Sequence, residues 1–211
     1  MFVVQTKKLL AFVAGFIILL GVAAFAPHNA LDLGFSEVMY TIQNPVFTII
    51  LGAITYISEP AVTILITLIL AGLFISRKRI REAIWFLGTM GGGVVLATII
   101  KTIVARTRPI HQVISESGYG FPSIHTLSAT LLVLILVTLF YNKVQHNRAL
   151  NILAMIWIPV VALSRVYLNA HYLTDVLGGF TLGVITYQLA RWLEPILYQK
   201  FLTIRGKTDV H

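Results

Sequence analysis

Histidine, serine, aspartate and basic residues recur in three short segments of the sequence. The segments are Lys101–Pro109, Phe121–His125 and Ser164–Asp175. Among their side chains are three cations, two histidines, one hydroxyl and one carboxylate that could act together: Lys101, Arg108, Arg165, His125, His171, Ser123 and Asp175. Three fixed cations around one point would repel one another, so they predict a multiply charged anion. Phosphate fits because arginine matches its oxygens with paired N–H groups and lysine adds a point charge.

His171 and Asp175 lie four residues apart. If a helix begins by His171, both side chains lie on one face and can form a hydrogen bond. A carboxylate on one ring nitrogen fixes the tautomer, leaves the other nitrogen free to attack and stabilises the charged product. His125 can then protonate a departing alkoxide and later activate water. The spacing therefore predicts a phosphohistidine intermediate, with His171 as the nucleophile.

Ser123 and Ile124 stand where a helix is expected to begin. Backbone N–H groups at a helix start, together with the helix dipole, favour an anion. Donors in this place also stabilise the charge on the equatorial oxygens during phosphoryl transfer. We therefore assign Ser123 and the backbone of Ile124 to phosphate binding, alongside the three cations.

The elements that must position these segments are membrane-spanning helices. Of the 211 residues, 57% are hydrophobic and 11% are charged, and the mean hydropathy is +0.86. A soluble domain carries about 25% charged residues, so this chain has too little polar surface to be coated by water. The composition predicts an all-α, polytopic membrane protein. Cysteine is absent, which excludes disulfides, thiolate nucleophiles and cysteine–metal sites.

Six apolar stretches have about the 20 residues that a helix needs to cross a bilayer. They are Leu9–Ala26, Ser58–Ile75, Ala83–Val104, His125–Tyr141, Ala149–Leu168 and Asp175–Leu193. A secretory signal is the alternative for the first stretch, but its length and the Pro27 that follows favour an uncleaved span. Gly91-Gly92-Gly93 in the third stretch predicts close helix packing.

The start of the second span is set by Ser58-Glu59-Pro60. These residues are typical of a helix start, with a capping hydroxyl, an acid in the first turn and an early proline. The preceding chain would otherwise make the span too long. The segment from Phe35 and the segment at Asn44-Pro45 are then expected to form short helices in the membrane interface.

Basic residues orient the bundle. Twelve of the sixteen fall on one face, which the positive-inside rule makes cytoplasmic. These twelve are Lys7, Lys8, Arg77, Lys78, Arg79, Arg81, Lys143, Arg148, Arg191, Lys200, Arg205 and Lys207. The net charge of +8 therefore reflects topology, and we predict no nucleic-acid partner. Both termini are expected in the cytoplasm.

The other four basic residues lie on the outer side: Lys101, Arg106, Arg108 and Arg165. With six spans, the loops after the first, third and fifth spans share the outer side, so all three segments converge there. Arg106 has two readings, as a residue that helps to bind a lipid headgroup or as a solvated loop charge.

The pattern closely resembles the type 2 phosphatidic acid phosphatase superfamily, also called lipid phosphate phosphatases. The family signature is Lys-x6-Arg-Pro, Pro-Ser-Gly-His and Ser-Arg-x5-His-x3-Asp. Lys101 to Arg108-Pro109 matches the first part, and Ser164-Arg165 to Asp175 matches the third. The second part is Pro122-Ser123-Ile124-His125, with isoleucine in place of glycine. The resemblance covers Leu9 to Leu193 of a single membrane-embedded domain that we assign to residues 1–211.

The resemblance implies a role for each motif residue. Phosphate is bound by Lys101, Arg108, Arg165 and Ser123, while His125 is the acid, His171 the nucleophile and Asp175 its orienting partner. It also implies that neither a metal nor another cofactor is needed. At Ile124 a requirement for positive φ would strain a β-branched residue. If only the N–H group contacts phosphate, isoleucine can supply it, and we favour this view.

Two other functions share parts of this pattern. Vanadate-dependent haloperoxidases have a similar site, but those relatives are soluble. A non-catalytic transporter or anion- or lipid-binding membrane protein also places charges inside a bundle, yet it has no need for a His–Asp pair facing a second histidine. The sequence favours a metal-independent lipid phosphatase that acts at the outer face of the cell membrane. The substrate is a phospholipid or isoprenoid phosphate, such as phosphatidylglycerophosphate, undecaprenyl pyrophosphate or phosphatidic acid, and the oligomeric state stays open.

Overall fold

Every regular element in the part of the chain that the structure describes is a helix. The computed structural model describes residues 6–140 and 148–208, with side chains for residues 6–140 and 149–196. Its eight helices in these ranges are α1 (Thr6–Phe25), α2 (Ala30–Thr41), α3 (Pro45–Ile57), α4 (Pro60–Ser76), α5 (Ile80–Val104), α6 (Ile124–Leu139), α8 (Arg148–Tyr167) and α9 (Leu173–Thr208). The predicted all-α class is therefore confirmed for these residues. The side chains of Lys143, Arg148, Lys200, Arg205 and Lys207, all assigned to the cytoplasmic face, lie outside the described ones.

Several helices are suited to a membrane. By length and composition, α1, α5 and residues Ala149–Tyr167 of α8 can each cross one. The pair α3 and α4 passes the same test together, although the chain bends by 44° between them. α6 is apolar but shorter, with 16 residues. The chain is thus a membrane protein, and the number of spans stays a prediction.

The helix starts before the bundle follow local capping chemistry. α2 begins at Ala30 rather than near Phe35, because Asn29 caps it and accepts a hydrogen bond from the backbone of Asp32 at 3.0 Å. Asn44 caps α3 in the same way, so the predicted helix at this position is confirmed.

The break between α3 and α4 lies where the sequence predicted a helix start, but Ser58 has a different role. Ser58 ends α3, and its hydroxyl donates to the carbonyl of Thr55 at 3.0 Å. The residue before α4 is Glu59, whose side chain makes no capping hydrogen bond, and Pro60 opens the helix. The prediction that Ser58 caps this helix was therefore wrong.

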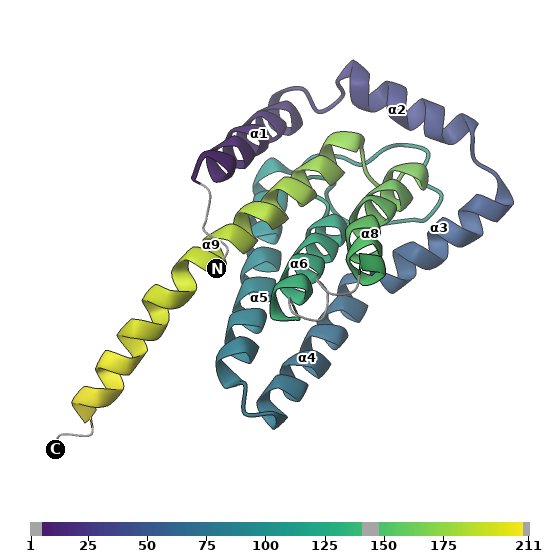
Figure 1. Cartoon of the computed structure of the whole chain (residues 1–211). Coiled ribbons are helices and arrows are strands. Elements are labelled where there is room, and N and C mark those ends of the chain that lie inside the picture. Colours follow the sequence, from purple (N-terminus) through teal and green to yellow (C-terminus); the bar gives the residue numbers. More distant parts are fainter. Residues whose placement is uncertain (1–5, 141–147, 209–211) are drawn as a thin grey trace.

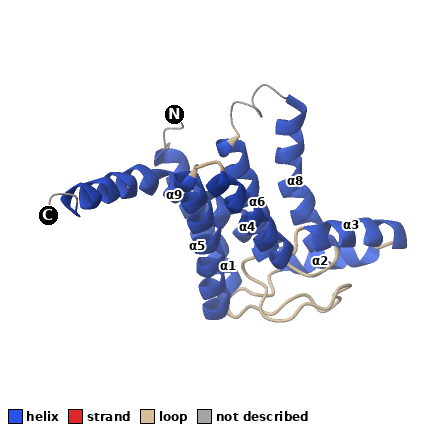
Figure 2. Cartoon of the chain, turned by 90° about the horizontal axis from the view of Figure 1, so that it is seen from below, coloured by secondary structure: helices blue, strands red, loops and turns tan. Residues whose placement is uncertain are grey.

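The helices form a bundle with two elements laid across one end (Figure 1). α9 packs against α1, α5 and α6, while α4 packs on α5 and α8 packs on α6. Figure 2 shows α2 and α3 beside the end of the bundle where the long loop between α5 and α6 lies. That loop and the turn between α8 and α9 carry Arg108, Ser123 and His171, and the other predicted site residues lie near the adjoining helix ends.

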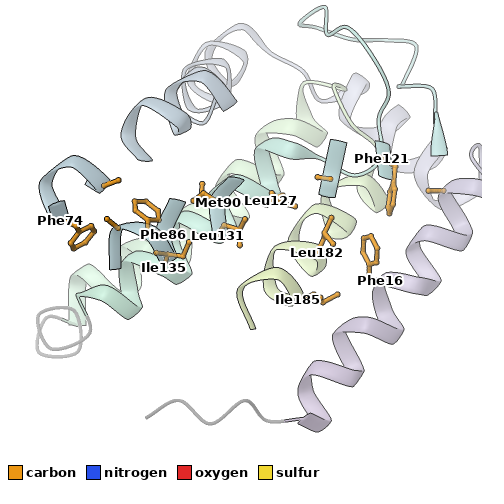
Figure 3. Packing of buried hydrophobic residues seen from close by; sticks show 14 residues of the cluster. Phe16, Phe74, Phe86, Met90, Phe121, Leu127, Leu131, Ile135, Leu182 and Ile185 are labelled. Carbon is orange, nitrogen blue, oxygen red and sulfur yellow. The ribbon is translucent and has the colours of Figure 1, made fainter. Parts of the chain in front are cut away.

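The apolar core runs along the bundle and reaches the predicted site. Phe86 and Met90 of α5 pack with Leu131 and Ile135 of α6 (Figure 3). At the other end, Phe121 stacks on Phe16 of α1, with ring centroids 6.0 Å apart. Because Phe121 lies two residues before Ser123, the core anchors the segment that opens α6.

Only one glycine of the triplet in α5 lies at a close helix contact. A Cβ atom at Gly93 would lie 2.5 Å from the side chain of Leu131 in α6, whereas one at Gly91 or Gly92 would meet nothing within 4 Å. The predicted close packing is confirmed at Gly93 and was wrong for the other two.

Candidate active site

Hydrogen bonds to backbone carbonyls hold the three predicted segments together at one end of the bundle. Lys101, in the last turn of α5, donates through Nζ to the carbonyls of Tyr119 at 2.6 Å and Gly120 at 3.0 Å. The backbone N–H group of Ser123 donates to the carbonyl of Asp175 at 3.0 Å. Residues far apart in the sequence are thus held within one small region, as the sequence predicted.

Arg108 lies against His171, the predicted nucleophile. Its Nη1 atom donates to the carbonyl of Ala170 at 2.8 Å and lies 3.2 Å from Nε2 of His171. The carbonyls of Ser117 and Gly118 accept from the rest of the guanidinium. These bonds hold the guanidinium beside the ring nitrogen that would attack a phosphorus atom.

Arg165 is fully buried in the last turn of α8 and points into the same region. Its Nη2 atom donates to Oε1 of Glu116 at 2.5 Å, while Nε and Nη1 have no hydrogen-bond partner among the described residues. The second oxygen of Glu116 lies 3.7 Å from Arg108. A carboxylate between two arginines marks this place as an anion site. Sequence reasoning missed Glu116, which belongs to no motif.

His171 and Asp175 meet through a turn rather than along a helix. α9 begins at Leu173, so the condition under which the sequence placed both side chains on one helix face is not met. The turn still places Nδ1 of His171 3.4 Å from Oδ2 of Asp175, an oxygen that accepts from the backbone of Tyr172 at 3.0 Å. The two side chains face each other without the predicted hydrogen bond, and Nδ1 has no hydrogen-bond partner among the described residues. A guanidinium donates and never accepts. The Arg108 contact therefore places the lone pair on Nε2 and the proton on Nδ1, facing Asp175.

The surroundings of His171 favour a neutral imidazole. Only 2% of the residue is exposed. Burial, and then the positive charges of Arg165, Arg108 and Lys101, lower its pKa well below the ordinary value. A neutral imidazole with its lone pair on Nε2 is the form that a nucleophile requires.

His125 has an acidic partner that the sequence did not predict. It lies in the first turn of α6, nearly buried, with Nε2 3.1 Å from Oε2 of Glu59. Glu59 precedes α4, which packs on α6. The sequence indicated only that Glu59 belongs to a helix start. Its pairing with His125 depends on two helices beginning side by side, which local sequence does not reveal.

The residue that replaces the family glycine is unstrained. Ser123 caps α6, with Oγ accepting from the backbone of Thr126, and Ile124 is the first helical residue. Ile124 is not among the residues with positive φ. The structure therefore supports the view that isoleucine adds bulk while its backbone remains available.

Arg106 matches neither reading from the sequence. Its side chain is fully buried and contacts Oδ2 of Asp32 and Oδ1 of Asp175, each at 2.7 Å. It is neither a solvated loop charge nor exposed to a headgroup. Asp32, on α2, was also missed, because nothing in its local sequence points to a partner 74 residues away. In the ranges with side chains, no group of three or more histidine, cysteine, aspartate or glutamate residues is arranged to hold a metal ion.

Comparison with known proteins shows the family of this chain. The model of the PAP2 superfamily matches residues 82–197, which include all three segments. The chain belongs to the PAP2 superfamily. This confirms the resemblance seen in the motifs. Because this superfamily hydrolyses lipid phosphates, the PAP2 protein described here is a membrane lipid phosphatase, as predicted.

Two relatives and two solved structures show the extent of the similarity. The PAP2 protein is 29% identical over 188 residues to phosphatidylglycerophosphatase B of Bacillus subtilis, covering 85% of this chain and 92% of that protein. It is 32% identical over 138 residues to decaprenylphosphoryl-5-phosphoribose phosphatase of Mycobacterium tuberculosis, covering 62% and 71%.

The crystal structure of a transmembrane PAP2 type phosphatidylglycerolphosphate phosphatase from Bacillus subtilis matches with a TM-score of 0.77 and 27% identity, over 89% of this chain and 96% of that chain. Aquifex aeolicus LpxE matches with a TM-score of 0.63 and 19% identity, over 77% of this chain and 96% of that chain. The second match supports the fold alone.

Proposed function

We propose that this PAP2 protein removes phosphate from a membrane lipid through a phosphohistidine formed on His171. The observation that carries the proposal is the environment of the ring. Asp175 lies on the Nδ1 side at 3.4 Å, and the phosphate-binding guanidinium of Arg108 lies on the Nε2 side at 3.2 Å. A base on one nitrogen and an anion site at the other is the arrangement that nucleophilic attack on a phosphoryl group needs.

The substrate phosphate is bound by Lys101, Arg108 and Arg165. Ser123 and the N–H group of Ile124 add donors at the start of α6. In the structure the carboxylate of Glu116 lies on Arg165, so the substrate phosphate takes over this position. The two N–H-bearing atoms of Arg165 without partners among the described residues, Nε and Nη1, would then donate to phosphate oxygens. These donors stabilise the charge that spreads over the equatorial oxygens in the transition state.

The reaction then has two steps. Nε2 of His171 forms a bond to phosphorus while the bond from phosphorus to the lipid oxygen breaks, and protonated His125 transfers its proton to that oxygen. Asp175 stabilises the positive charge on the ring. In the second step, neutral His125 takes a proton from water as the water oxygen attacks phosphorus. The P–N bond breaks, inorganic phosphate leaves and His125 is again protonated.

The topology that suits this chemistry has six spans: α1, α4, α5, α6, α8 and α9. α2 and α3 lie along the outer face, and both termini are cytoplasmic. Two arrangements support this proposal. The α5–α6 loop and the α8–α9 turn lie at the end beside α2 and α3 (Figure 2), and the basic turn of residues 77–79 lies at the far ends of α4 and α5. The active site would then face the outer leaflet.

The substrate that we propose first is the phosphate monoester of a phospholipid, with phosphatidylglycerophosphate as the leading candidate. A relative matched over 92% of its length is named as a phosphatidylglycerophosphatase. An isoprenoid phosphate or pyrophosphate is the second candidate, because another relative is named for a decaprenylphosphoryl substrate.

The test is hydrolysis of each lipid by the purified protein in detergent with a chelator present. We expect release of inorganic phosphate, a radioactive protein band after brief exposure to labelled substrate, and loss of both in His171→Ala. His111→Ala is the matched control, since His111 is exposed and stacks on Tyr40 away from the predicted residues. Wild-type turnover by His171→Ala would refute the nucleophile. Phosphate release from none of the lipids, or its abolition by the chelator, would refute the metal-independent reaction.

A further inference from the structure

Three charged side chains lie in a row behind His171. The guanidinium of Arg106 contacts Asp32 through Nη2 and Asp175 through Nη1, each at 2.7 Å, and all three side chains are fully buried. The ring of Tyr172 packs on the guanidinium at 4.6 Å. Removing ions from water is costly unless each is paired and hydrogen-bonded. This row meets that condition, and it ends at the carboxylate that faces the proposed nucleophile.

The two oxygens of Asp175 have separate partners. Oδ1 accepts from Arg106, while Oδ2 accepts from the backbone of Tyr172 and faces Nδ1 of His171. Arg106 therefore holds the oxygen that does not face the ring. With one oxygen held by the guanidinium and the other by a backbone N–H group, the carboxylate plane cannot turn, and Oδ2 stays directed at the imidazole.

Asp32 is held as firmly as Asp175. Its Oδ1 atom accepts from the backbone of Thr174 at 3.0 Å, and Oδ2 accepts from the hydroxyl of Thr174 at 2.6 Å and from Asn29 at 2.7 Å. Burial alone would raise the pKa of Asp32, but the hydrogen bonds from Arg106, Thr174 and Asn29 together lower it below the ordinary value. Asp32 is therefore an anion next to Arg106.

The charges of the row decide how Asp175 acts on His171. A guanidinium paired with Asp175 alone would neutralise the carboxylate and weaken its support for a positively charged ring. With Asp32 on the other side, one cation is shared between two anions. The row then carries a net charge of −1, and the end that faces His171 stays negative. Such a charge stabilises the imidazolium that forms when Nε2 bonds to phosphorus.

We propose that Arg106 and Asp32 are positioning residues of the phosphatase reaction. Arg106 directs Asp175 at Nδ1 of His171, and Asp32 balances Arg106 so that Asp175 keeps its negative charge. The inference rests on the proposed role of His171. It also gives α2 a part in catalysis, because the helix beside the bundle carries one of the three charges.

The test compares Asp32→Asn with Ser36→Ala. Asp32→Asn removes the charge and keeps the shape. Ser36→Ala removes another tie of α2 to the α8–α9 turn, the 2.9 Å hydrogen bond from Ser36 to Asn169, without touching the row. Loss of an outer partner from a metal-bound histidine lowers activity about 10- to 100-fold, and we expect a fall of this size in kcat for Asp32→Asn, with KM changed less than about threefold. Ser36→Ala should keep kcat within about twofold of the wild type.

A double-mutant cycle separates positioning from docking of α2. If Asp32 acts through Asp175, Asp32→Asn should cause no further loss of kcat in an Asp175→Asn background. An equal loss in both backgrounds, or a loss in Asp32→Asn no larger than in Ser36→Ala, would overturn the inference. If Asp32→Asn does not fold, Arg106→Lys takes its place in the same cycle. A lysine keeps the charge but lacks the fork that joins two carboxylates.

Failure of this inference differs from failure of the proposed function. If His171→Ala is inactive while Asp32→Asn has wild-type kcat, only the positioning role is wrong. If His171→Ala retains wild-type turnover, the proposed nucleophile is wrong, whatever Asp32→Asn does.

Discussion

Replacing Gly179 with alanine should push the active-site residues at the start of α6 away from those at the start of α9. A Cβ atom at Gly179 would lie 2.3 Å from the carbonyl oxygen of Ser123, where ordinary contact begins at 3.4 Å. That oxygen is backbone and accepts the first hydrogen bond of α6, from Leu127. It cannot rotate aside, so α6 and α9 must move apart by about 1 Å.

This displacement acts directly on the reacting groups. His125 and Ser123 move with α6, whereas Asp175 moves with α9 and His171 with the turn before it. A 1 Å misplacement of reacting groups costs on the order of 100-fold in rate. Overpacking of this kind also destabilises a protein by about 1–3 kcal/mol. We expect kcat/KM of Gly179→Ala to fall on the order of 100-fold, with a lower melting temperature.

Initial rates in detergent, measured well below the melting temperature of each variant, separate the geometric effect from unfolding. Gly92→Ala is the matched control, because a Cβ there would meet nothing within 4 Å. Alanine also favours a helix by up to about 1 kcal/mol relative to glycine. It should keep the wild-type rate. If Gly179→Ala had kcat/KM within threefold of Gly92→Ala, the close approach of α9 to the start of α6 would not control the site.

Three further predictions follow from the pairs within the site. Glu59→Gln should lower kcat about 10-fold on an alkyl phosphate. This is less than the roughly 10²- to 10⁴-fold that a general acid contributes, because His125 itself is kept. The loss should be much smaller on p-nitrophenyl phosphate, whose leaving group needs no proton from His125, and equal losses on both substrates would contradict the role of this pair. Glu116→Gln removes the carboxylate that lies on Arg165, so inorganic phosphate should inhibit at a several-fold lower concentration, and weaker inhibition would contradict the view that the two anions share one position. Because the pKa of His171 is lowered from its ordinary value of 6.5, the ring keeps its lone pair as the pH falls through 6.5, and the acid limb of kcat/KM due to this group should lie below that pH in a profile measured from pH 4 to 8.

Spacing along the chain predicted part of the candidate site. His171 and Asp175 lie four positions apart, and this interval brings the two side chains together although the helix begins only at Leu173. The apolar composition likewise predicts a helical membrane protein, because only structures that satisfy their own backbone hydrogen bonds are stable in lipid. Helix boundaries were less secure. Ser58 faces back into α3, where its hydroxyl donates to the carbonyl of Thr55.

The partners of the catalytic groups were decided by the tertiary structure. Glu59 meets His125 across 66 residues, Glu116 meets Arg165 across 49, and Asp32 meets Arg106 across 74. None of these acids has a motif of its own, and each pairing requires two distant elements to begin or end at the same place. The sequence alone therefore predicts which residues attack and protonate a phosphate ester. The packing of α2, α4 and the α5–α6 loop determined which charges surround them, because burial between helices, rather than spacing along the chain, sets which ions must be paired.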